Sequence, residues 1–175
     1  MSRSKKLSVL LGALLAVCLI TFGVSQYEVH KEKIKNSDEI ILELPGATVK
    51  SLSWEYNSET LAFHKDGKWL YDGDGAFRVD EEKINERLDL FSEFGVSFII
   101  EDVEDFGQYG LDKPVCTIHL ETDDESYEIL LGDFSKMDSE RYVSIGDGNV
   151  YLVKKDPLDY FDATLSDMIK QDEIP

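Results

Sequence analysis

The clearest indication of how this chain folds is the stretch Leu61-Ala62-Phe63-His64-Lys65-Asp66-Gly67-Lys68-Trp69-Leu70-Tyr71. Two short runs rich in apolar residues, 61–64 and 68–71, meet across Lys65-Asp66-Gly67. An Asp-Gly pair supplies the positive φ angles of a tight turn. The stretch therefore predicts a β-hairpin.

Similar patterns occur on both sides of this hairpin. Residues 115–120 and 127–131 predict a second hairpin across 122–125, and residues 141–145 and 150–153 predict a third across 147–149. Strands are also expected at 40–44, before Pro45-Gly46, at 48–56 and at the apolar run 98–100. Short strands joined by tight turns are typical of a largely antiparallel sheet.

Two segments have helical spacing instead. Residues 80–94 begin with Asp80, a good N-cap, and Gly95 is expected to end the helix. The second begins at Asp156-Pro157, an N-cap followed by a first-turn proline. Their apolar stripes are Ile84, Leu88, Phe91 and Phe94 in the first, and Leu158, Phe161, Leu165, Met168 and Ile169 in the second. The fold class expected is α+β, with largely antiparallel β-hairpins and two amphipathic helices, preceded by one N-terminal transmembrane helix.

The transmembrane helix is predicted because residues 7–27 hold no charge. A helix over residues 7–24 would be about 27 Å long, close to the ~30 Å hydrocarbon core of a bilayer. An uncleaved anchor is preferred over two alternatives, a signal peptide cleaved before Gln26 and a lipoprotein modified at Cys18. Arg3, Lys5 and Lys6 place the N-terminus in the cytoplasm.

These features divide the chain into four parts. Residues 1–6 form a cytoplasmic tail, 7–25 the transmembrane anchor, 26–38 a stalk and 39–175 an extracytoplasmic α+β domain. Residues 36–175 hold 12 basic and 34 acidic side chains, a net charge of −22. Such a surface repels phosphate backbones, so nucleic acid is excluded as a partner, and it also repels anionic lipid headgroups.

No set of residues predicts catalysis, cofactor binding or a metal site. The loop Asp72-Gly73-Asp74-Gly75 fails as a calcium loop, because Lys83 stands where the twelfth position requires Glu. The histidines, His30, His64 and His119, have no metal-ligand spacing, and Cys116 is expected to be a small buried apolar residue. The many carboxylates would form some close pairs by chance in any fold. The chain is therefore not expected to be an enzyme.

The most distinctive string is Asp105-Phe106-Gly107-Gln108-Tyr109-Gly110-Leu111-Asp112-Lys113-Pro114. It predicts a turn in which Gly110 takes an unusual backbone angle and Pro114 fixes the entry to the next strand. With Tyr109-Gly110-Leu111-Asp112 and Pro114, the chain resembles a bacterial domain family of unknown function, DUF4340. Agreement extends over about residues 40–165, at Asp66-Gly67-Lys68-Trp69, Val79-Asp80, Leu131-Gly132, Arg141-Tyr142-Val143 and Val150-Tyr151-Leu152-Val153.

The resemblance implies a membrane-tethered extracytoplasmic protein whose gene often lies beside those of ABC exporters similar to the gliding-motility type. It implies no catalytic residue. The function expected is a non-enzymatic accessory or binding component of an ABC-type export assembly, held in the cell membrane by the N-terminal helix. Two alternatives remain open, a cell-envelope hydrolase that uses a carboxylate pair and a self-associating structural module.

Overall fold

The structure is a computed structural model that describes residues 33–36 and 38–170. The expected cytoplasmic tail, the transmembrane anchor and residues 26–32 of the stalk lie outside the described residues. The chain divides into two units, 1–32 and 33–175, and the described residues all belong to the second. Within the described part, no helix has both the length and the apolar character needed to cross a bilayer.

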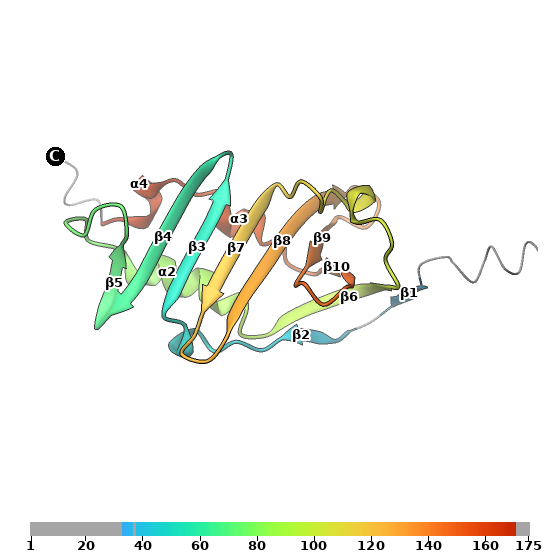
Figure 1. Cartoon of the computed structure of the whole chain (residues 1–175), viewed down its shortest axis with the longest axis horizontal. Helices are drawn as coiled ribbons and strands as arrows, with labels where there is room; N and C mark the ends of the chain where they lie inside the picture. The colour runs from blue at the N-terminus through green and yellow to red at the C-terminus, as the bar shows by residue number, and fades with distance from the viewer. Residues whose placement is uncertain (1–32, 37, 171–175) are drawn as a thin grey trace, which may run out of the picture. The chain divides into compact units, whose positions relative to one another are not determined.

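The described residues form one antiparallel sheet in the order β1-β6-β10-β9-β8-β7-β3-β4-β5, with β2 also paired to β6 (Figure 1). The strands are β1 (Lys33–Asn36), β2 (Ile40–Leu42), β3 (Ser51–Tyr56), β4 (Glu59–Asp66), β5 (Lys68–Tyr71), β6 (Phe94–Glu101), β7 (Cys116–Glu121), β8 (Ser126–Ser135), β9 (Glu140–Ser144) and β10 (Val150–Val153). The expected α+β class with a largely antiparallel sheet is confirmed.

All three predicted hairpins are present. β4 and β5 pair in register from Phe63–Tyr71 to Asp66–Lys68, and Gly67 turns between them with φ +70°. β7 pairs with β8, and β9 with β10. Gly148 has φ +89° in the third turn, as the tight-turn signal requires.

The first predicted helix is shorter than its apolar stripe suggested. Helix α2 spans Glu81–Asp89, and the Asp80 carboxylate accepts a hydrogen bond from the backbone N–H of Glu82, which confirms the N-cap. Phe94 and Gly95 belong to β6, where they pair with β2. The prediction that the helix reaches Phe94 and ends at Gly95 is wrong. Strand pairing outweighs helical spacing here, while Phe94 still reaches the core from the strand.

The second predicted helix is divided in two, α3 (Leu158–Phe161) and α4 (Leu165–Met168). The Asp156 carboxylate accepts from the backbone N–H of Leu158, as an N-cap does. Thr164 is the N-cap of α4, and the Asp167 carboxylate accepts from both its backbone N–H and its hydroxyl. The break keeps Phe161 and Met168 buried on the same core.

Residues 33–36 lie in the segment expected to be a stalk, yet they form β1. This strand pairs with β6 from Lys33–Glu101 to Asn36–Phe98. Backbone pairing of this kind was not predictable from residues 26–38, which mix charges and show little apolar periodicity. The sheet therefore begins at Lys33, before the expected domain boundary at residue 39.

The two faces of the sheet differ. One face carries α2, α3 and α4 and holds the main core, and α2 and α3 lie behind β3, β4 and β7 in Figure 1. The largest fully buried side chains of this core are Trp54, Phe63, Phe91, Phe94 and Phe161. Trp54 and Phe161 meet edge to face with ring centroids 5.3 Å apart. We call this the helix side of the sheet.

The opposite face is covered over β6, β10, β9 and β8 by residues 102–114, which include the 3₁₀ helix η2 (Phe106–Tyr109). Gly110 ends η2 with φ +73°, so its predicted unusual backbone angle is confirmed. Gly132 of β8 lies directly under this covering segment. A Cβ at Gly132 would stand 2.2 Å from the carbonyl oxygen of Tyr109. The distinctive string thus closes a second, smaller core. We call this face the loop side.

Candidate functional site

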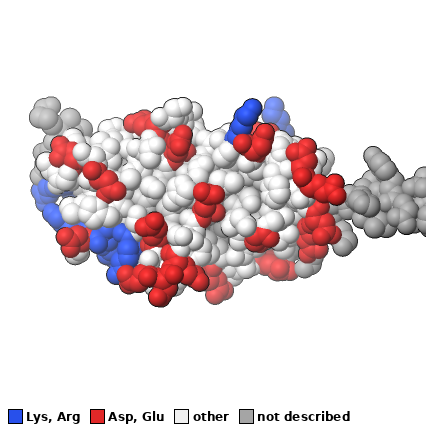
Figure 2. Space-filling model, viewed as in Figure 1, with Lys and Arg blue, Asp and Glu red and all other residues white. Residues whose placement is uncertain are grey.

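Carboxylates dominate the surface of the described domain. Figure 2 shows Asp and Glu side chains spread over the loop side and along its rim, with fewer Lys and Arg side chains among them. Acidity alone does not mark a site, because a solvated acidic surface also keeps a domain soluble. Hollows and polar groups that the fold buries are better markers of a site.

The residues that the sequence analysis considered as possible metal ligands or catalytic groups lie apart from one another. Asp72 and Gly73 lie in a bend, Gly75 lies in the turn that follows, and the Asp72 carboxylate pairs with Nδ1 of His64 at 2.5 Å. His119 faces Glu128 on the loop side, with 3.7 Å between Nδ1 and Oε2. Both histidines are about half exposed. His30 and Cys18 lie outside the described residues.

Cys116 is buried in β7, as predicted, and burial raises the pKa of its thiol to about 12. A thiol with such a pKa is protonated at neutral pH, and the nucleophile is the thiolate. Within residues 33–36 and 38–170, no three His, Cys, Asp or Glu side chains are grouped so that they could hold a metal ion.

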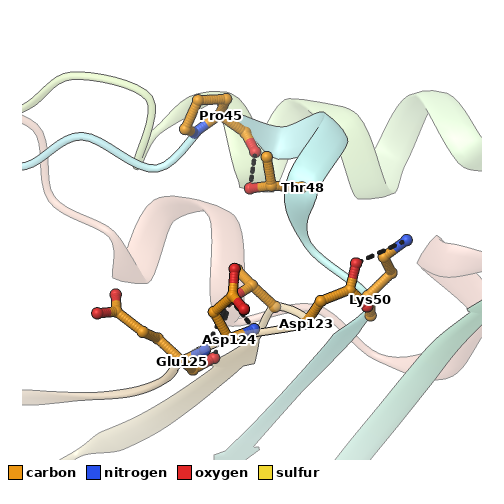
Figure 3. Close-up of polar contacts among 7 residues, drawn as sticks. Pro45, Thr48, Lys50, Asp123, Asp124 and Glu125 are labelled. Atoms are coloured by element: carbon orange, nitrogen blue, oxygen red, sulfur yellow. Dashed lines mark hydrogen bonds and ion pairs between the residues drawn. The ribbon is translucent and has the colours of Figure 1, made fainter.

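A first hollow lies between η1 (Gly46–Thr48) and the β7–β8 turn, with a volume of about 590 Å³ (Figure 3). We call it the hairpin hollow. Its turn residues Asp123, Asp124 and Glu125 are polar and surface-lying, and Lys50 reaches Asp123 at 3.5 Å. The hydroxyl oxygen of Thr122 stabilises the turn, because it accepts hydrogen bonds from the backbone N–H groups of Asp124 and Glu125. These polar contacts are local turn contacts, so they point to no ligand.

A second hollow lies between α2 and the α3–α4 segment on the helix side, with a volume of about 710 Å³. We call it the Arg87 hollow. Its charged lining residues are Asp80, Lys83, Glu86, Arg87, Asp159, Asp162 and Asp167, a net charge of −3. Its volume falls in the ~300–1,000 Å³ range of ligand sites, although its lining is more polar than is usual for them.

Arg87 distinguishes this hollow from the other. Only 6% of the residue is exposed, and its Nη1 donates to the carbonyl oxygen of Lys83 at 2.8 Å. The guanidinium lies over the ring of Trp54, 5.7 Å from the centroid, close enough for a cation–π contact. Its Nε is buried with no hydrogen-bond partner among the described residues. Burying a donor without an acceptor costs about 1–3 kcal/mol.

The electrostatics of this hollow follow from burial and from the carboxylates around it. Desolvation lowers the pKa of Arg87, and the nearby charges of Glu86, Asp167 and Asp162 act in the opposite direction. Hydrogen bonds from Thr164 hold the pKa of Asp167 below its ordinary value. Lys83 pairs with Glu86 at 3.2 Å. The carboxylates of Asp159 and Asp162 have no hydrogen bond or salt bridge within the described part of the chain.

The sequence prediction missed this arrangement. Arg87 stands three residues after Ile84 and one before Leu88, so it lies on the apolar stripe of α2. A charged residue on a buried stripe was the one available signal. Its significance depends on Trp54 and on the α3–α4 segment, which are distant in sequence.

A sheet covered on one face by short helices, with polar hollows between its elements, defines a small α+β domain. The chain belongs to the family described as Domain of unknown function (DUF4340), which it matches over residues 69–174. No curated protein matches the chain. No solved structure matches it. The family match confirms the resemblance seen in the motifs, and it assigns no activity.

Proposed function

We propose that this chain is a single-pass, membrane-anchored extracytoplasmic domain that acts as a non-enzymatic binding component of an ABC-type export assembly. The Arg87 hollow is the observation that carries the binding role. Its volume suits a ligand, and charged side chains from α2 and from the α3–α4 segment line it. The uncharged run 7–27 supports the anchor, and the family resemblance supports the export assembly.

The chemistry of the described side chains also favours binding over catalysis. The thiol with a raised pKa is buried, and the two described histidines are half exposed and lie on the loop side, each beside one carboxylate. A catalytic acid and base need environments that separate their pKa values, which calls for burial or close charge pairs in a cleft. The hollows offer solvated carboxylates and one fixed arginine.

The test is affinity purification of the full chain from membranes solubilised in a mild detergent. We expect subunits of an ABC transporter to be recovered with it. Two matched variants locate the contact, one with residues 7–25 replaced by an unrelated membrane helix and one that lacks residues 39–175. Recovery should survive the first change and be lost in the second. Absence of any transporter subunit with the full chain would contradict the proposal.

A further inference from the structure

We draw no further inference here: the strongest candidate, the exposed apolar patch that Phe134 and Met137 form at the end of the β8–β9 hairpin, carries none, because nothing in the structure shows what covers it.

Discussion

On the helix side of the sheet, α2, α3 and α4 cover a core of large aromatic side chains, and the Arg87 hollow opens between these helices. On the loop side, residues 102–114 cover only part of the sheet, over a core centred on Ile100, Tyr109, Leu111, Val150 and Leu152. Ser53, Ala62 and His119, which are neighbours across β3, β4 and β7 on the same face, lie beyond this cover. The comparison shows that the helix side holds the larger core and also, among the described residues, the buried side-chain donor without a partner, Nε of Arg87.

The largest expected effect follows from emptying the helix-side core at Phe161. This side chain is fully buried and packs against Trp54 and Phe91, with ring centroids 5.3 and 6.0 Å away. Phe161→Ala should lower the free energy of unfolding by about 3–5 kcal/mol, measured by denaturant titration. Thr60→Ala, at an exposed position on the loop side, should change it by no more than about 0.5 kcal/mol. Equal effects would remove the contrast between the two faces.

The next largest loss of stability is expected from breaking the salt bridge between Arg141 and Asp156, which connects the start of α3 to the sheet. Arg141 is 7% exposed, and it donates to both carboxylate oxygens of Asp156 and to the carbonyl oxygen of Gly132. Asp156→Ala would leave this buried charge without its partner and should cost about 3 kcal/mol in the same titration. Glu86→Ala breaks the exposed pair with Lys83 and should cost less than about 1 kcal/mol. A loss for Asp156→Ala no larger than that for Glu86→Ala would contradict a structural role for this pair.

A smaller effect is expected on the loop side, where residues 102–114 approach the sheet closely. Gly132→Ala would place a Cβ 2.2 Å from the backbone oxygen of Tyr109, so the covering segment must shift. We expect a loss of about 1–3 kcal/mol. The control is Gly75→Ala, since nothing lies within 4 Å of a Cβ at Gly75. Unchanged stability of the Gly132 variant would show that this segment is not held against the sheet.

The smallest expected effect is a change in the free energy of unfolding with pH. It comes from Cys116, a core residue on the helix side. Its thiol has a pKa of about 12 in the folded protein, against an ordinary value of 9.0. The unfolded chain therefore loses this proton first, so its contribution to stability is constant below about pH 9 and falls as the pH rises toward 12. In a Cys18→Ser background, a thiol reagent at pH 8 should label Cys116 only as fast as the protein unfolds. Rapid labelling of the folded chain would contradict this burial.

Much of the sheet was predictable from local signals. The Asp-Gly turn at 66–67 and the alternation in β7 and β8 indicate their hairpins directly, because turn chemistry and apolar spacing are local properties. The end of α2 was not predictable in this way. Phe94 fits the helical stripe of Ile84 and Leu88, but it belongs to β6 because β2 pairs there. Contacts distant in sequence decide such boundaries.

The candidate site was harder to predict than the fold. Its carboxylates are common residue types in an acidic chain, so Asp159 and Asp162 carry no signal of their own. Arg87 becomes unusual only when Trp54 and the α3–α4 segment bury it. A site made of ordinary residues from distant segments leaves little trace in one sequence.

The central claim is that recognition belongs to the helix side of the sheet. It is tested most directly by nuclear magnetic resonance of the ¹⁵N-labelled full chain in detergent, titrated with the transporter subunit recovered in the affinity purification. We predict that backbone amide shifts concentrate in residues 83–87 and 159–167. Shifts concentrated instead at Ser53, Ala62 and His119, on the loop side, would contradict the claim.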